Sequence, residues 1–381
     1  MNRLFLLLLI LPLGACGQKG QLRTGADQLE VLLPKLAGQR VGMMVNHTSM
    51  VGARHLADTL KSRGVNLAKI YVPEHGFRGT ADAGEVVKDG IDPSTGVPVI
   101  SLYGSSKKAT KEQMADVDVV LFDLQDVGAR FFTYISSLHY FMEACAENNK
   151  KLIILDRPNP NGSYVDGPVM HPEFKSFVGM HPIPITHGMS IGEYARMVNG
   201  EGWLKDGEKC ALEVITMKNW KHTDTYHIPY KPSPNLPNDH AIGMYPSTCL
   251  FEGTALSIGR GTMNPFEVVG HPDLKNQPYS FTPVSIDGMS KEPPLQDQLC
   301  YGLDMRNEPL PKEVTLKYII KLYNEFPDKD KFFNGYFDKL AGTTKLKEQI
   351  RSGMSEKAIK ATWKNELDAF KAIRAKYLLY P

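Results

Sequence analysis

What the sequence contains little of already excludes several large classes of protein. Its 381 residues carry 44 Lys and Arg against 42 Asp and Glu, so no basic excess argues for a nucleic-acid partner. A mean hydropathy of −0.27 excludes a polytopic membrane protein. The GxGxxG loop that cradles a dinucleotide does not follow the first predicted strand, where residues 46–52 read NHTSMVG. We therefore expect no nucleotide and no other cofactor.

Cysteine is also scarce, with five residues in the whole chain. Apart from Cys16, the cysteines stand 39 to 65 residues apart, with no CxxC or CxxxH spacing. A zinc site held by sulfur is therefore not expected. A chain of this length can bury a core without covalent cross-links, so we expect these four thiols to be free and buried.

The first 16 residues, MNRLFLLLLILPLGAC, have the pattern of an export signal. Arg3 precedes an apolar run over 4–13, about half the length that spans a bilayer. The run ends at LGAC, which resembles the processing box of bacterial lipoproteins; the alternative is an ordinary secretory signal with a chance cysteine. We predict a signal peptide over 1–15, lipidation of Cys16 and a lipid-anchored tether over 16–26. The expected location is the cell envelope. The outer membrane is favoured, because Gly17 does not resemble an inner-membrane retention signal.

Short apolar runs alternate with helical segments through the first half of the chain. Predicted strands cover 40–45, 67–72, 97–102, 117–122 and 151–155, and predicted helices cover about 50–63 and 133–148. This alternation favours βαβ units and a parallel sheet. We predict an α/β fold class, with a Rossmann-like parallel-sheet domain over 27–200, a second, smaller α/β domain over 201–381, and an intervening cleft.

Further elements are predicted from local signals. Ser190 and Glu193 form a capping box that opens a helix reaching about residue 199. Short strands are expected at 183–185 and 211–217, helices at 314–326 and within 345–378, and a long irregular loop at 228–247, where five prolines cluster.

Polar clusters follow four of the predicted strands directly. They are Asn46 with His47; Glu74 with His75 and Arg78; Asp123 with Asp126 and Arg130; and Asp156 with Arg157. In open parallel sheets, ligands bind outside the carboxyl ends of the strands. One charged strand end is usually a solvated turn or a helix cap, but four on one edge predict a shared pocket.

A pair of carboxyl groups in such a pocket suits glycoside cleavage, in which one protonates the leaving oxygen and a second group acts at the anomeric centre. Glu74 is the candidate acid because it lies in a predicted tight turn, and Asp123 or Asp126 is the candidate second carboxylate. The alternative is structural pairing, of Glu74 with Arg78 and of the aspartates with Arg130.

Arginine and histidine side chains allow two further interpretations. The guanidinium forks suit an anionic group on a substrate, or they neutralise the neighbouring aspartates; the candidates are Arg78, Arg130, Arg157 and Arg260. His47 and His75 could orient acids, bind substrate hydroxyls or join the aspartates in a metal site. We expect no metal.

Six motifs together resemble one known family. They are PEHGFRG at 73–79, FDLQDVGAR at 122–130, DRPNP at 156–160, HGMS at 187–190, PSPN at 232–235 and FEGT at 251–254. Their number and order resemble the DUF1343 family, the exo-β-N-acetylmuramidases of the NamZ type. The resemblance implies a glycosidase that removes β-1,4-linked N-acetylmuramic acid from the non-reducing end of peptidoglycan fragments, with its active site in a cleft between two domains.

The resemblance also implies roles for individual residues. The family's catalytic glutamate falls on Glu74. The other motif positions are expected to line the cleft and bind the saccharide; they are His75, Arg78, Asp123, Asp126, Arg130, Asp156, Arg157, His187, Asn235, Glu252 and Arg260. Asn46 and His47 join them from the strand-end pattern.

Several questions stay open at the level of sequence. A non-catalytic muropeptide- or sugar-binding lipoprotein would share the two domains and the cleft, and a metal-dependent hydrolase is a third reading. Within the glycosidase hypothesis, a nucleophile about 5 Å from the acid, an inverting pair about 6.5–9.5 Å apart, and attack by the substrate's own acetamido group all remain compatible.

Overall fold

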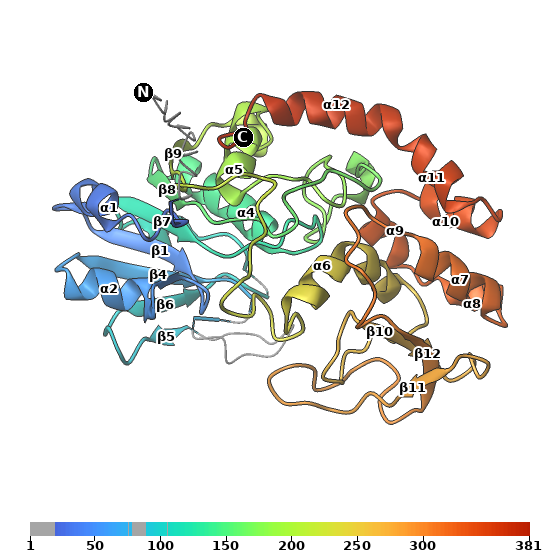
Figure 1. Cartoon of the computed structure of the whole chain (residues 1–381). Coiled ribbons are helices and arrows are strands. Elements are labelled where there is room, and N and C mark those ends of the chain that lie inside the picture. Colours follow the sequence, from blue (N-terminus) through green and yellow to red (C-terminus); the bar gives the residue numbers. More distant parts are fainter. Residues whose placement is uncertain (1–19, 75, 78–88, 105) are drawn as a thin grey trace, which may run out of the picture.

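The computed structural model describes residues 20–74, 76–77, 89–104 and 106–381. The predicted signal peptide, Cys16, His75 and Arg78 lie outside the described residues. Within the described residues, no helix is both long enough and apolar enough to cross a membrane. Figure 1 shows one large sheet at the left, built from strands within residues 41–215, and a smaller sheet at the lower right, built from strands within residues 268–304.

Seven strands form the large sheet. They are β1 (Val41–Val45), β4 (Leu67–Val72), β5 (Gly90–Ile91), β6 (Pro98–Ser101), β7 (Val119–Asp123), β8 (Lys151–Leu155) and β9 (Ala211–Ile215), in the order β5-β6-β4-β1-β7-β8-β9. All neighbouring pairs are parallel except β5 with β6. The predicted parallel sheet is confirmed, and the carboxyl ends of its six parallel strands therefore share one edge.

Alternate residues of the sheet face opposite layers of helix. Met43, Ile70 and Leu121 pack in a core with α1 (Leu29–Leu36) and α2 (Leu56–Ser62). Met44 and Phe122 pack in a second core with α4 (Tyr134–Glu147) and α5 (Ile191–Gly200). This period of two follows from the pleat of a strand, and burial on both faces explains why the strands read as continuous apolar runs.

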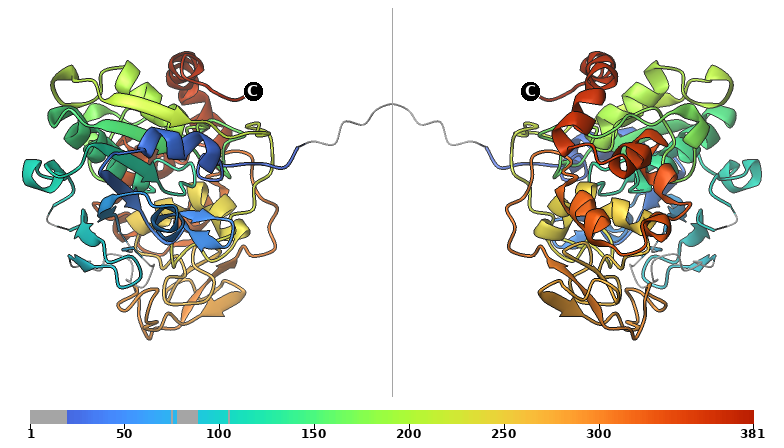
Figure 2. Two further views of the ribbon diagram at one scale, coloured as in Figure 1. Left: turned by 90° about the vertical axis from the view of Figure 1, so that its left-hand side faces the viewer. Right: turned by 90° about the vertical axis from the view of Figure 1, so that its right-hand side faces the viewer.

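A smaller C-terminal part combines helices with an antiparallel sheet. The sheet has the order β10-β12-β11, and its strands are β10 (Val268–His271), β11 (Tyr279–Phe281) and β12 (Cys300–Asp304). Its helices are α6 (Asp239–Thr248), α7 (Lys317–Glu325), α8 (Lys329–Phe332), α9 (Phe337–Ala341), α10 (Lys345–Arg351), α11 (Glu356–Thr362) and α12 (Lys364–Ala375). In the views of Figure 2, α12 lies at the opposite end of the molecule from the small sheet.

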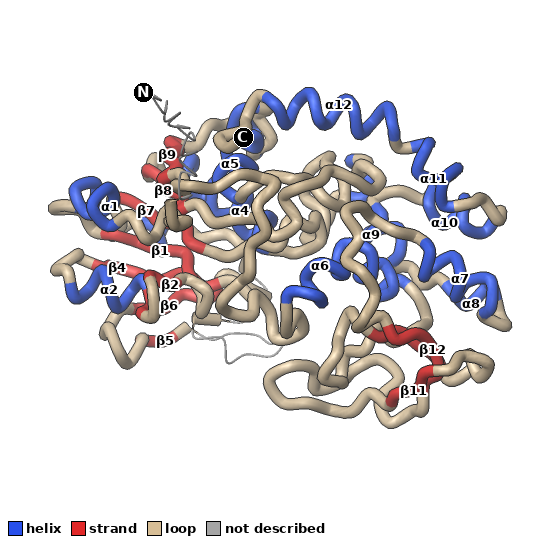
Figure 3. Tube along the Cα trace, in the orientation of Figure 1, coloured by secondary structure: helices blue, strands red, loops and turns tan. Residues whose placement is uncertain are grey.

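Short elements and long loops complete the chain. The short elements are the hairpin of β2 (Met50–Val51) and β3 (Arg54–His55), helix α3 (Lys111–Met114), and the 3-10 turns η1 (Pro172–Phe174), η2 (Lys205–Gly207) and η3 (Cys249–Gly253). Figure 3 shows that loops make up much of the region between the two sheets. The expectation that the four cysteines after Cys16 are free and buried is confirmed.

Three predicted elements are wrong for identifiable reasons. Residues 50–55 are a hairpin rather than the first turns of a helix, because Gly52 turns the chain with a φ of +57°. Residues 183–185 form no strand, since Pro182 and Pro184 have no N–H to donate to a neighbour. Residues 183–185 lie in a loop, and isolated antiparallel bridges form beside them, from Thr186 to Ala129 and to Asp166.

The third miss is α6, which occupies part of the predicted irregular loop at 228–247. Asn238 begins it by accepting a hydrogen bond from the Ala241 N–H at 2.7 Å. Pro246 within the helix cannot donate to the carbonyl of Ile242. That carbonyl instead accepts a hydrogen bond from Asn161 Nδ2 at 3.1 Å, so a side chain from another segment offsets the effect of the proline.

A clamp at the start of α5 holds the end of the described chain against the large sheet. The Tyr380 hydroxyl donates to Asp156 Oδ2 at 2.5 Å, and the Leu379 N–H donates to Glu193 Oε1 at 2.7 Å. Asp156 also accepts hydrogen bonds from Ser190 and Gly192 at the first turn of the helix. Burial raises the pKa of Asp156 to about 6, against the opposing effect of these donors.

Arg130 connects the N-terminal part to the C-terminal part. Its side chain is fully buried, and its terminal nitrogens donate at 2.7–2.8 Å to the carbonyls of Pro168, Ile183, Leu340 and Ala341. The last two belong to the end of α9, where a positive charge complements the helix dipole. Burial lowers the pKa of Arg130 to about 9, which still leaves the guanidinium charged at neutral pH.

We predict that Arg130→Met destabilises the fold. Methionine fills a similar space, but it leaves four buried carbonyls without these donors, and each unsatisfied group costs about 1–3 kcal/mol. Thermal unfolding followed by circular dichroism should show a clearly lower melting temperature. Arg63→Met, at an exposed position, is the matched control and should change little. Equal effects of the two substitutions would contradict the connecting role of Arg130.

Candidate active site

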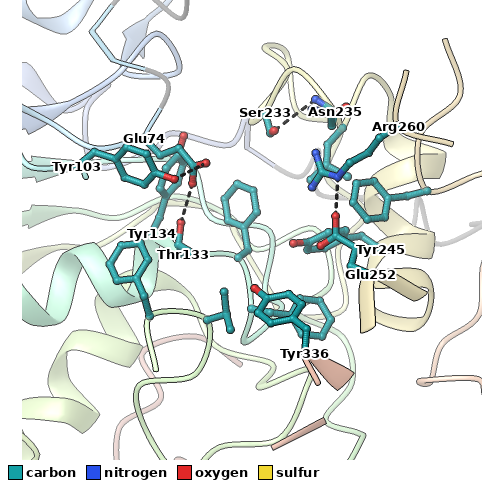
Figure 4. Close-up of a pocket in the computed structure, with 16 residues that line it drawn as sticks. Glu74, Tyr103, Thr133, Tyr134, Ser233, Asn235, Tyr245, Glu252, Arg260 and Tyr336 are labelled. Atoms are coloured by element: carbon teal, nitrogen blue, oxygen red, sulfur yellow. Dashed lines mark hydrogen bonds and ion pairs between the residues drawn. The ribbon is translucent and has the colours of Figure 1, made fainter. Parts of the chain in front are cut away.

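A cavity of about 220 Å³ lies at the carboxyl edge of the large sheet and is lined from both parts of the chain (Figure 4). Its lining residues are Glu74, Tyr103, Phe131, Phe132, Thr133, Tyr134, Phe177, Val178, Ser233, Asn235, Leu236, Tyr245, Glu252, Arg260, Phe266 and Tyr336. Aromatic rings supply much of the wall, and the only carboxylates among these residues are Glu74 and Glu252.

Glu74 and its partners form the N-terminal wall. Glu74 follows β4 in a turn closed by a hydrogen bond from the Gly76 N–H to the Pro73 carbonyl, and the φ of +71° at Gly76 favours glycine. Glu74 Oε1 accepts a hydrogen bond from the Tyr103 hydroxyl at 3.0 Å, and Oε2 accepts one from Thr133 Oγ1 at 3.3 Å. Tyr103 follows β6, and Thr133 precedes α4 after β7. Three parallel strands thus bring these groups together.

An ion pair forms the opposite wall. Arg260 Nε donates to Glu252 Oε1 at 2.5 Å, and the guanidinium lies 5.1 Å from the centre of the Phe266 ring. Burial acts to lower the pKa of Arg260, but the charge and the hydrogen bond of Glu252, together with Tyr245 and Cys249, raise that pKa above its usual value. Among the described residues, the two terminal nitrogens of Arg260 have no hydrogen-bond partner. They form an open fork on a side chain that is 23% exposed.

Asn235 and Tyr336 complete the polar lining. Asn235 Nδ2 donates to the Met289 carbonyl at 2.8 Å, which fixes the orientation of the amide. Tyr336 belongs to the loop before α9 and is about a third exposed. Burial, with the nearby Cys249 and Glu252, raises the pKa of the Tyr336 phenol, so it stays protonated at neutral pH.

Of the predicted site residues, Glu74, Asn235, Glu252 and Arg260 line this cavity, whereas Asp123 and Arg157 do not. Asp123 is fully buried and forms a bidentate ion pair with Arg157, at 2.5 Å to Nε and 2.8 Å to a terminal nitrogen. Burial alone would lower the pKa of Arg157, but Asp123 raises it above the usual value. This is the structural pairing of an aspartate with an arginine, although the partner is Arg157 rather than Arg130.

Asp156 and Arg130 are likewise placed inside the fold rather than on the cavity wall. Asp156 holds the first turn of α5 and Tyr380, and Arg130 holds backbone carbonyls. Neither side chain is among the residues that line the cavity. The same holds for Ser190, whose hydroxyl donates to Asp156 at the start of α5.

Asp126 and His187 face each other in the interior, next to the segment that lines the cavity. The shortest distance between Asp126 Oδ2 and His187 Nε2 is 3.7 Å, and the same Oδ2 accepts a hydrogen bond from the Gly128 N–H at 2.6 Å. Among the described residues, Asp126 Oδ1 has no hydrogen-bond partner. Both side chains are buried, and neither is among the residues that line the cavity.

Asn46 and His47 contact the cavity only indirectly. Asn46 Nδ2 donates to the hydroxyl of Tyr134, a lining residue, at 2.7 Å. His47 Nε2 lies 2.7 Å from the Lys231 carbonyl, which precedes the lining segment at Ser233. These two predicted binding residues support the walls behind the cavity. Within the described ranges, no cluster of three or more His, Cys, Asp or Glu side chains is placed to hold a metal ion.

Tyr103, Thr133 and Tyr336 line the cavity but are absent from the site residues predicted from the sequence. Tyr103 comes directly after the predicted strand at 97–102, so it has the strand-end signal but not the charge on which the prediction depends. Tyr336 has no such signal, because it reaches the cavity from a loop that packs there only through tertiary contacts.

The fold and this cavity define an α/β protein with a concave polar and aromatic site, in which two glutamates and an arginine line opposite walls. Two family models match the chain: the N-terminal model of exo-β-N-acetylmuramidase NamZ over residues 41–240, and the C-terminal model over 243–380. The chain therefore belongs to the NamZ family, also described as DUF1343.

Relatives support this assignment along nearly the whole chain. The peptidoglycan β-N-acetylmuramidase NamZ of Bacillus subtilis (strain 168) is 38% identical, over 95% of this chain and 92% of its own length. A crystal structure of a DUF1343 family protein from Bacteroides fragilis NCTC 9343 is 45% identical, covers 95% of this chain and 99% of its own, and superimposes with a TM-score of 0.89. The crystal structure of a second DUF1343 family protein of that strain is 30% identical, covers 94% of this chain and 99% of its own, and has a TM-score of 0.79.

Proposed function

We propose that this protein is an exo-acting glycosidase that releases N-acetylmuramic acid from the non-reducing ends of peptidoglycan fragments. The observation that carries the proposal is the cavity in which Glu74 faces an open arginine fork, in a chain of the NamZ family. Peptidoglycan β-N-acetylmuramidase is the name of the Bacillus subtilis relative. The activity fits a cell-wall turnover or recycling role.

Glu74 is assigned the role of general acid and base. A glycosidic oxygen needs a proton as its bond to the anomeric carbon breaks, and a carboxyl group supplies it in most glycosidases. The other carboxylate that lines the cavity, Glu252, is already paired with Arg260 at 2.5 Å. Its role is to hold the guanidinium in place, which leaves proton transfer to Glu74.

Arg260 is assigned to the lactyl carboxylate of N-acetylmuramic acid. This group distinguishes the sugar from N-acetylglucosamine, and a carboxylate matches the two parallel N–H bonds of a guanidinium fork. Glu252 engages only Nε of Arg260, so both terminal nitrogens remain for a substrate. The Phe266 ring beside the guanidinium keeps the fork in one orientation.

The finer description of the fold belongs to the same proposal. The six parallel strands, numbered in chain order, are arranged 3-2-1-4-5-6, which supports a Rossmann-like sheet. The cavity is lined from the proposed domain over 27–200, including Glu74, and from the smaller one over 201–381, including Arg260. We propose that it is the cleft between them.

Glu74→Gln should abolish hydrolysis of a chromogenic β-N-acetylmuramide, because glutamine cannot donate the proton; a loss of at least about 10²–10⁴-fold is expected. Glu208→Gln, an exposed position, is the matched control and should retain wild-type turnover. Circular dichroism should show both variants folded. Turnover by Glu74→Gln would refute the acid role. Wild-type protein that binds muropeptides without releasing a sugar would instead indicate a binding lipoprotein.

Arg260→Met should weaken recognition of the lactyl group selectively. A hydrogen bond to a charged group contributes about 1.5–3 kcal/mol, so kcat/KM for the muramide should fall by about 10–150-fold. Calorimetric titration should show weaker binding of free N-acetylmuramic acid, and no comparable change for N-acetylglucosamine. Arg260→Lys keeps the charge but loses the fork, and an intermediate effect is expected. Equal losses for both sugars would argue against this assignment.

We also propose that the mature protein is a lipid-anchored lipoprotein of the cell envelope, most consistent with the outer membrane. The support is the apolar run over 4–13 followed by LGAC at 13–16. Labelled palmitate should be incorporated into the wild-type protein during expression in bacteria and should be absent from Cys16→Ala. Labelling of the variant would contradict lipidation at Cys16.

A further inference from the structure

We propose that Tyr103 is a positioning residue for Glu74, and that its hydroxyl fixes which oxygen of the carboxyl group delivers the proton. The inference rests on the proposed glycosidase function and deepens it. Tyr103 carries no charge and belongs to none of the six motifs, and its place at the cavity wall is seen only in the structure.

Among the described residues, two hydroxyls from two different elements contact Glu74. Tyr103 follows β6 and contacts Oε1 at 3.0 Å, whereas Thr133 stands before α4 and contacts Oε2 at 3.3 Å. Thr133 occupies the N-cap position of α4, yet its side chain makes no capping hydrogen bond. The backbone of Thr133 is itself helical, with φ −74° and ψ −1°, which does not suit a capping side chain, and its hydroxyl instead donates to Glu74.

The Tyr103 hydroxyl stays protonated at neutral pH and can therefore donate a hydrogen bond to Glu74. Burial raises the pKa of the phenol, and the negative charge of Glu74 raises it further, so the hydroxyl keeps its proton at neutral pH. A protonated phenol of this kind is a poor nucleophile, which favours a positioning role over direct attack on the sugar. The ring lies 6.5 Å from that of Phe177, which in turn stacks on Tyr140 at 6.3 Å. These rings restrict the movement of Tyr103.

The two contacts give the oxygens of Glu74 different roles. Oε1 accepts the shorter hydrogen bond, from Tyr103, and is held as the acceptor oxygen. Oε2 has the longer contact, with Thr133, and is the oxygen that carries the proton. As that proton passes to the leaving oxygen, Glu74 gains a negative charge and the hydrogen bond from Tyr103 becomes charge-assisted and stronger. An interaction that strengthens during the chemical step lowers its barrier more than it improves substrate binding. Removing it should therefore reduce kcat rather than raise KM.

The test compares Tyr103→Phe with Tyr140→Phe. Both remove one hydroxyl from the same aromatic cluster, but no described residue accepts a hydrogen bond from Tyr140. Tyr103→Phe should lower kcat on a chromogenic β-N-acetylmuramide by about 10–100-fold with KM nearly unchanged, the fold-change expected from one hydrogen bond to a charged group. Tyr140→Phe should behave as wild type.

The pH profile gives a readout that a purely structural role would not change. Without the donor, the ionised carboxylate of Glu74 loses stabilisation. The limb of the kcat/KM profile that coincides with the Glu74 titration in the wild-type protein should therefore move to higher pH in Tyr103→Phe. Carbon-13 NMR of glutamate carboxyl groups, assigned with Glu74→Gln, should show the same upward movement of the Glu74 titration.

Each outcome decides between explanations. An unchanged kcat and an unchanged titration would overturn the proposal. Complete loss of turnover in a folded Tyr103→Phe would also overturn it, because it would assign the phenol to the chemical step itself. If the wild-type protein releases no sugar, the proposed function fails, whereas the NMR titration still tests the contact between Tyr103 and Glu74.

Discussion

The buried guanidinium of Arg130 is the interaction on which the geometry of the cavity depends. The four residues after it, 131–134, line the N-terminal wall, and the carbonyls it binds at 340 and 341 follow the lining residue Tyr336 by only a few positions. One charged side chain therefore sets the spacing between two walls that are more than 200 residues apart in sequence. Because it binds carbonyls rather than a carboxylate, it does so without placing a negative charge near Glu74.

The sequence predicted the sheet well and the site only in part. Uninterrupted apolar runs such as 67–72 identify buried parallel strands, and the charged residues after them do lie on one edge. A charged strand end, however, looks the same in sequence whether it faces a ligand or another buried charge. Asp123 and Arg157 neutralise each other, and only Glu74 of the charged strand ends described here reaches the cavity. The opposite wall comes from α6, η3 and neighbouring loops, whose position depends on tertiary packing; the motifs point to Asn235 and Glu252, but strand-end patterns do not.

The two walls differ in how they control charge. Among the described residues, two neutral hydroxyls, those of Tyr103 and Thr133, donate hydrogen bonds to Glu74. Glu252 is instead held in an ion pair with Arg260. The same residue type thus stands in two different surroundings, set by its neighbours. The division agrees with a substrate that must be protonated at one atom and recognised by its own negative charge at another.

The clamp on Asp156 and Glu193 has a consequence for folding. Their partners Tyr380 and Leu379 lie 224 and 186 positions further along the chain. The first turn of α5 therefore reaches its final packing only when a segment far away in the sequence has joined it. This contact makes the parallel-sheet part dependent on the smaller C-terminal part for its completion, in addition to the cavity that they line together.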